Sequence, residues 1–495
     1  MKKKLIALGT LFAICLSMLA TDMVVKQKNG EDWKINVNDV EEVVFEETIP
    51  EDSTVIDVSE TFLLFNILSD STAELTRDDS GDEHSYYGHD SITIPPKVRI
   101  DGKVYTVTSI GAGAFEFNDK LKNVNIPEGV TSIGARAFYG CFSLASIDIP
   151  ESVTSIGDLA FSRCKSLASI DIPESVTSIG DNAFEYCSSL TSIKIPEGVT
   201  SIGYWAFYGC DNLEPKLLIY DKGTKCYGWV GDKKKCTEVV IPEGVTSIGN
   251  SAFNGCSNLT SIDIPEEVTS IGNSAFNGCS NLTSIDIPEE VTSIGDNAFY
   301  KCSSLASIDI PESVTSIGDL AFDGCNSLEP KLLIYDKDTK CYGWVGNREK
   351  CTDVLIPEGV TSIGDYAFYG CERLTNVNIP EGVTSIGNSA FNGCSNLTSI
   401  DIPESVTSIG NFAFSRCGSL TNINIPERLT TIGNSAFNGC SNLTSIDIPE
   451  SVISIGWSAF SSCSNLDIVI NNSKDNVEVG TDAFKNCKSV TWLKE

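Results

Sequence analysis

The sequence predicts a mostly β fold: a single solenoid of about 17 coils of 23 residues, preceded by a small N-terminal β region. Three observations predict it. A pattern recurs at a fixed period, apolar and polar residues alternate within each repeat, and a proline and a glycine occupy set places in each repeat. A 23-residue unit alone buries too little surface to offset its chain entropy, so such units are expected to stack.

The Phe of an Ala-Phe pair marks the period. It recurs in steps of 23 residues, with two steps of 46 and a last step of 24, at Phe115, Phe138, Phe161, Phe184, Phe207, Phe253, Phe276, Phe299, Phe322, Phe368, Phe391, Phe414, Phe437, Phe460 and Phe484. Each double step hides a variant coil, so these 15 landmarks imply 17 coils in all.

The unit at 144–166 shows the alternation within one repeat. Its inward residues have the two-residue period of a half-buried strand, and they are Leu144, Ile147 and Ile149. Pro150 has no N–H and ends that strand. A second extended stretch sends Val153 and Ile156 inward, and Gly157 is then expected to turn the chain with a positive φ. The far side is filled by Ala160, Phe161 and Cys164.

The repeat Leu-x-x-Ile-x-Ile-Pro-Glu-x-Val-Thr-Ser-Ile-Gly-x-x-Ala-Phe-x-x-Cys resembles the BspA-type leucine-rich repeats of bacterial surface proteins, over about residues 105–490. The resemblance implies a leucine-rich repeat solenoid and a role in adhesion to host matrix or to other bacteria. One departure is that the buried Asn of other leucine-rich repeats is absent, with Gly129, Ser152 or Glu267 near that point. A short strand and a 3₁₀-like turn are therefore expected instead of a long convex helix.

Composition excludes several classes of function. The formal net charge of −32 disfavours nucleic-acid binding and favours cationic partners. The two histidines, His84 and His89, lie in one polar stretch, and no plausible Ser-His-Asp or Cys-His set or phosphate-cradling glycine loop is present. We expect no enzyme and no cofactor.

The N-terminus predicts export. Three lysines precede an apolar run from Leu5 to Ala20, which is the layout of a secretory signal peptide, residues 1–20. A membrane anchor and lipidation at Cys15 are the alternatives, and we expect no transmembrane span in the mature chain. Residues 21–60 are predicted to form a β segment and an acidic linker. The rest divides into a hairpin cap (61–105), the solenoid (106–470) and an atypical last coil (471–495).

Of the 19 cysteines, 14 lie three residues after a landmark Phe, from Cys141 to Cys487. They are interpreted as small buried hydrophobic side chains. The pairs Cys226–Cys236 and Cys341–Cys351 are the alternative, as disulfides. No Cys-x-x-Cys pair occurs, and no metal is assigned.

The variant coils, 213–242 and 328–357, are near copies and carry aromatic rings beside a basic run. Such rings are candidate contact points on an acidic array, although packing on adjacent coils is the alternative. They are Tyr227, Trp229, Tyr342 and Trp344.

The outward position between the two Ile residues of each unit predicts an acidic ribbon along the array. Its candidate partner-binding residues are Asp148, Asp171, Asp263, Asp286, Asp309, Asp401 and Asp447. For each Asp alone, a solvated surface residue is the simpler interpretation, and calcium binding is a further alternative. The sequence thus favours an exported protein that binds proteins or glycans outside the cell, with an envelope scaffold as the alternative.

Overall fold

The computed structural model describes residues 55–77, 86, 89–337 and 339–494 with their side chains. It also describes the backbone of four earlier strands, β1 (Lys3–Leu8), β2 (Asp22–Lys26), β3 (Asp32–Asn36) and β4 (Val40–Glu46). β1 pairs in parallel with β4, and β2 pairs antiparallel with β3. Residues 9–20 of the predicted signal peptide, with Cys15, lie outside the described residues, as does His84.

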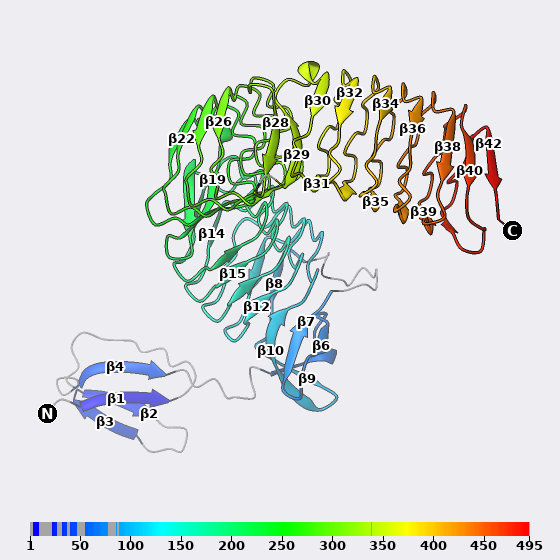
Figure 1. Cartoon of the computed structure of the whole chain (residues 1–495). Coiled ribbons are helices and arrows are strands. Elements are labelled where there is room, and N and C mark those ends of the chain that lie inside the picture. The colour runs from blue at the N-terminus through cyan, green and yellow to red at the C-terminus, as the bar shows by residue number, and fades with distance from the viewer. Residues whose placement is uncertain are drawn as a thin grey trace.

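The predicted solenoid is confirmed: about 17 turns of roughly 23 residues stack along a curved axis (Figure 1). No α-helix occurs in the described residues. Most rungs contribute one short strand to a first parallel ladder, in which hydrogen bonds join the strands in groups of two, and of three at the C-terminal end. It consists of β8 (Ser91–Thr93), β11 (Asn123–Asn125), β14 (Ser169–Asp171), β16 (Ser192–Lys194), β20 (Glu238–Val240), β22 (Ser261–Asp263), β24 (Ser284–Asp286), β26 (Ser307–Asp309), β30 (Asp353–Leu355), β32 (Asn376–Asn378), β34 (Ser399–Ile400), β36 (Asn422–Ile423), β38 (Ser445–Ile448), β40 (Asp467–Ile470) and β42 (Ser489–Trp492).

A second parallel ladder is made of strands that, after the first one, are two residues long. It consists of β10 (Lys103–Ile110), β12 (Ser132–Ile133), β13 (Ser155–Ile156), β15 (Ser178–Ile179), β17 (Ser201–Ile202), β21 (Ser247–Ile248), β23 (Ser270–Ile271), β25 (Ser293–Ile294), β27 (Ser316–Ile317), β31 (Ser362–Ile363), β33 (Ser385–Ile386), β35 (Ser408–Ile409), β37 (Thr431–Ile432), β39 (Ser454–Ile455) and β41 (Glu478–Val479). Within each run of regular rungs, the Ile pairs with the Ile 23 residues later, as in Ile156↔Ile179. The register therefore equals the sequence period.

Two hairpins interrupt the second ladder at the variant coils. The first is β18 (Lys216–Tyr220) with β19 (Lys225–Val230), followed by the 3₁₀ turn η5 (Lys233–Lys235). The second is β28 (Lys331–Tyr335) with β29 (Lys340–Val345), followed by η6 (Arg348–Lys350). In each, the second strand continues the ladder and the first strand forms an edge, so the ladder divides into three sheets.

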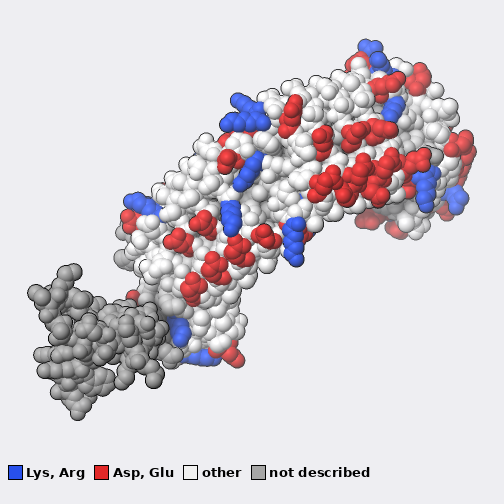
Figure 2. All heavy atoms as spheres, turned by 90° about the vertical axis from the view of Figure 1, so that its left-hand side faces the viewer, with Lys and Arg blue, Asp and Glu red and all other residues white. Residues whose placement is uncertain are grey.

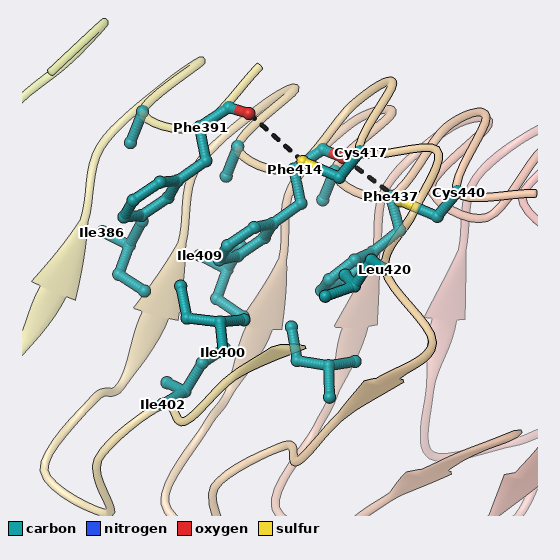
Figure 3. Close-up of a cluster of buried hydrophobic side chains, with 14 of the residues drawn as sticks. Ile386, Phe391, Ile400, Ile402, Ile409, Phe414, Cys417, Leu420, Phe437 and Cys440 are labelled. Atoms are coloured by element: carbon teal, nitrogen blue, oxygen red, sulfur yellow. Dashed lines mark hydrogen bonds between the residues drawn. The ribbon is translucent and has the colours of Figure 1, made fainter. Parts of the chain in front are cut away.

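The core consists of stacked phenylalanine rings. Phe414 is fully buried, and its ring centroid lies 5.3 Å from those of Phe391 and Phe437, nearly parallel to both (Figure 3). The stack ends at Phe207, where Tyr227 meets it edge-on at 5.6 Å, and starts again at Phe253. The buried apolar residues accordingly form three clusters that meet at the variant coils.

The 18 described cysteines are free thiols, and all but Cys487 are buried. The interpretation of the Cys ladder as buried small side chains is confirmed. The ladder thiols other than Cys256 and Cys371 also donate to a backbone carbonyl, as Cys417 Sγ does to that of Phe391 at 3.2 Å (Figure 3). The variant-coil cysteines are free as well, so the alternative of disulfides within these coils does not describe the structure.

Gly157 does not have the expected positive φ. A Cβ there would lie 2.7 Å from the backbone nitrogen of Ala135 in the preceding rung, so glycine is needed for close approach of two backbones. The positive φ values occur instead two residues before and two after the landmark Phe, as at Leu159 (58°) and Arg163 (64°).

These left-handed residues also explain why the expected 3₁₀-like turn is not a continuous helix. The N–H groups of this turn alternate between two kinds of partner. Some bond within the rung, as from Cys141 to the Phe138 carbonyl at 3.1 Å, and the others bond to the next rung, as from Phe138 to the Ala160 carbonyl at 2.7 Å. The turn segment thus serves as a third side that joins neighbouring rungs.

The N-terminal end of the array is closed by β5 (Val55–Asp57), η3 (Val58–Glu60), β6 (Phe65–Ile67), β7 (Thr72–Leu75) and β9 (Lys97–Ile100). β9 and β10 form an antiparallel hairpin, and β7 pairs in parallel with β10. Tyr86 covers the first ring of the stack, with its centroid 5.4 Å from that of Phe115. Its backbone carbonyl accepts a hydrogen bond from Asn118, which stands where later rungs have Cys.

At the C-terminal end, Asn472 bonds to the preceding rung, where its Nδ2 donates to the carbonyl of Glu450 at 2.9 Å. Phe484, the last landmark, is 6.1 Å from Phe460, farther than the rings of the regular stack. The extra residue in the last step therefore loosens the final rung.

Candidate partner-binding surfaces

The first ladder positions the predicted acidic ribbon. Each of its three-residue strands has a buried Ile or Val between two exposed residues, so the Asp that follows the Ile points outward. Asp286 and Asp309 are in register on adjacent strands. All seven predicted Asp residues are exposed, namely Asp148, Asp171, Asp263, Asp286, Asp309, Asp401 and Asp447.

A second line of acids follows the proline of each rung. Glu151, Glu174 and Glu197 are exposed. Lys194 breaks the Asp series and donates to Glu174 at 2.8 Å, and this bond raises the pKa of Lys194. Figure 2 shows one face of the molecule on which Asp and Glu side chains lie in rows along the array. The arrangement creates an extended negative field with few cations in it.

The ribbon has apolar residues in place of Asp at the two variant coils. Val240 and Leu355 occupy the Asp position there, and their side chains are 69% and 72% exposed. The two apolar residues therefore occupy the same position relative to the variant-coil hairpin that each follows.

The four predicted variant-coil rings are half-buried and pack against neighbouring rungs. The hydroxyl of Tyr227 accepts the N–H of Phe207 at 3.2 Å, and burial raises the pKa of Tyr227 well above its usual value. Trp229 and Trp344 donate their indole N–H groups to the carbonyls of Asp232 and Asn347. Tyr342 lies beneath the ammonium of Lys340, 4.6 Å from its ring centroid. These rings hold the hairpins on the array and keep part of their surface open.

Sequence reasoning missed a group of aromatic rings just before the first variant coil. Trp205 lies 4.4 Å from Tyr204 and 5.4 Å from Tyr208, and Tyr208 meets Tyr186 at 5.5 Å. Trp205 is 37% and Tyr186 is 40% exposed. The signal was the run Gly-Tyr-Trp-Ala-Phe-Tyr, which places three extra rings in one repeat.

The described residues contain no group of three or more His, Cys, Asp or Glu side chains placed to hold a metal ion. Burial raises the pKa of the Cys164 and Cys187 thiols, and that of Cys417 to about 12, so these three thiols are not nucleophiles near neutral pH. His89 stacks on Phe62 at 3.9 Å in the N-terminal cap. Among the described residues, no helix is long and apolar enough to cross a membrane.

Comparison with known proteins agrees with the repeat geometry. The model of the BspA type leucine-rich repeat region matches residues 92–215, 231–339 and 347–491 in six copies. The chain belongs to this family. No protein with a curated description matches it.

Solved structures of leucine-rich repeat proteins are similar to the chain. One from Bacteroides ovatus is 27% identical, with 87% of this chain and 98% of that chain covered and a TM-score of 0.32. A leucine-rich cell surface protein from Faecalibacterium prausnitzii is 29% identical, with coverage of 88% and 93% and a TM-score of 0.32. A protein from Eubacterium ventriosum is 25% identical, with coverage of 72% and 92% and a TM-score of 0.45.

Proposed function

We propose that the chain is an exported, non-enzymatic binding protein that contacts proteins or glycans outside the cell, in the manner of an adhesin. The observation that carries the proposal is the acidic ribbon, because it repeats one outward carboxylate over many rungs in register. A ribbon of this kind suits a large partner, since contact over many rungs adds weak interactions together. Export would rest on residues 1–20 and would bring the ribbon to its partner.

The experiment is binding of the purified chain to arrays of matrix proteins and glycans at low and physiological salt. A triple variant, D263N/D286N/D309N, neutralises three consecutive rungs of the ribbon. We expect the wild-type chain to bind a cationic or mixed-charge partner in a salt-dependent way, and the variant to bind at least ~10-fold more weakly. Stability should be unchanged or slightly higher, because like charges on adjacent strands repel.

A matched control removes three exposed acids that lie off the ribbon, Asp119, Glu372 and Asp475, as D119N/E372Q/D475N. It changes net charge equally and should leave binding within about twofold of wild type. An equal loss of binding affinity in both variants would show that net charge, and not the ribbon, determines binding. Failure of the wild-type chain to bind any partner would reject the adhesin-like role and favour the envelope scaffold.

A further inference from the structure

The two variant coils are near copies, but their central cations have different neighbours. In the second coil, Arg348 pairs with Asp323 at 2.9 Å. Lys233 holds the same place in the first coil, and the residue that corresponds to Asp323 is Tyr208, directly after the landmark Phe in both rungs. The first coil therefore lacks the internal counter-ion that the second coil has.

The ammonium of Lys233 lies 5.3 Å from the ring centroid of Tyr208 and donates to the backbone carbonyl of Asn254. Among the described residues, no carboxylate lies within ion-pair distance of it. Burial lowers the pKa of Lys233, with more distant charges such as Asp211 opposing that shift. A half-buried cation without an anionic partner is costly, so an incoming anion would gain by pairing with it.

This cation lines a shallow hollow that is open to solvent and encloses only about 20 Å³. Its walls include the rings of Trp205, Tyr208 and Trp229. The second coil has the equivalent hollow, lined by Tyr342, Trp344 and Arg348. Its wall also contains Asp319, Asp323 and Asp365, where the first coil has Tyr204, Tyr208 and Asn250, so the two hollows differ in charge.

Ser251 adds a buried polar group to the wall of this hollow. It lines the same hollow, and its hydroxyl oxygen is buried without a hydrogen-bond partner. A buried hydroxyl that lacks a partner costs free energy, which a ligand hydroxyl could recover. The hollow therefore offers aromatic faces, one uncompensated cation and one unused hydroxyl.

We propose that this hollow binds an acidic sugar unit of a glycan, a carboxylated pyranose. The carboxylate pairs with Lys233, the apolar face of the sugar ring packs on Trp205 and Tyr208, and a sugar hydroxyl bonds to Ser251. An acidic peptide side chain would satisfy the cation but would leave the aromatic walls and the buried hydroxyl unused. The inference rests on the proposed function and names the ligand class at one point of the array.

The test titrates the full chain with glucuronic acid, N-acetylneuraminic acid and glucose, followed by tryptophan fluorescence and calorimetry. We expect saturable binding of at least one acidic sugar, at least ~10-fold tighter than glucose, because a charge-assisted bond is lost with the neutral sugar. Two variants remove the site chemistry. K233M keeps the aliphatic stem, and Y208D supplies the internal counter-ion that the second coil has.

Both variants should weaken binding of the acidic sugar at least ~10-fold. R348M is the matched control, because it changes the paired cation of the second coil and should leave sugar binding unchanged. Circular dichroism verifies that each variant is folded. Equal affinity for acidic and neutral sugars, or undiminished binding by folded K233M and Y208D, would overturn the inference.

Two further outcomes separate this inference from the proposed function. If N-acetylglutamate binds as tightly as glucuronic acid, the hollow recognises a carboxylate and not a sugar, and the inference fails. If the chain binds an array partner but no acidic sugar, and K233M binds that partner normally, the inference fails while the proposed function stands.

Discussion

Replacing Phe414 with Ala tests the stacking of the core directly. The Phe414 ring is fully buried between two parallel neighbours, at 5.3 Å on each side. Truncation of a buried Phe costs about 3–5 kcal/mol, and this value includes the cavity that the ring leaves. Because rungs contact only their neighbours, the loss should fall on the junction between the rungs of Phe391 and Phe437.

The assay is urea unfolding followed by circular dichroism, with F412A as the control. Phe412 lies in the same rung but is half-buried at the surface, edge-on to Trp457 at 5.8 Å. We expect F414A to lower the midpoint strongly and to split the transition, and F412A to cost about 1 kcal/mol or less. Equal effects of the two variants would refute the claim that the phenylalanine stack holds the rungs together.

Three other predictions follow from the same rungs. G433A should destabilise the array, because a Cβ at Gly433 would lie 2.5 Å from the backbone of the preceding rung. G418A should be near neutral, because the nearest atom to a Cβ at Gly418 is 4.0 Å away. Thermal unfolding compares the two variants, and equal midpoints would contradict the close approach at Gly433. R416G should raise the free energy of unfolding by about 1 kcal/mol in urea titrations, because Arg416 has a φ of 60° at a position where most rungs have glycine. A lower free energy of unfolding would show that contacts of the arginine side chain outweigh its backbone strain. Burial raises the pKa of the Cys141, Cys210 and Cys417 thiols from 9.0 to about 12, so their contribution to stability is fully present below pH 9 and is lost as pH rises toward 12. The melting temperature should fall over that window, and a flat profile would contradict this prediction.

The sequence predicted the fold well because the information repeats. One rung leaves strand and turn ambiguous, but a fixed landmark Phe in every rung specifies the stacking register, the inward side chains and the outward Asp series. The thiols were predictable for the same reason, since each occupies one place relative to that Phe.

Residues without a repeated counterpart were harder to predict. The sequence showed that Gly157 holds a fixed place in the repeat, but not why glycine is required there. The reason is contact between rungs and not local turn chemistry, because a Cβ would lie 2.7 Å from a neighbouring backbone. The rings of Tyr186 and Trp205 occupy variable positions two residues after and before the landmark Phe, and only the stacked rungs bring them together. The sequence likewise did not show that Lys233 lacks a counter-ion, because this follows only from the position of Tyr208 beside its ammonium group.

Hydrogen exchange of the backbone amides tests most directly whether rungs of 23 residues stack in register along the described array. Except in the rungs of Phe207 and Phe322, which precede the variant coils, the landmark Phe amide bonds to a carbonyl of the next rung, as from Phe391 to the Ala413 carbonyl at 2.7 Å. We predict that these amides are protected from the rung of Phe115 to that of Phe460 and that protection recurs with the sequence period. Protected blocks separated by long unprotected stretches, without that period, would contradict the solenoid and the extended surface that depends on it.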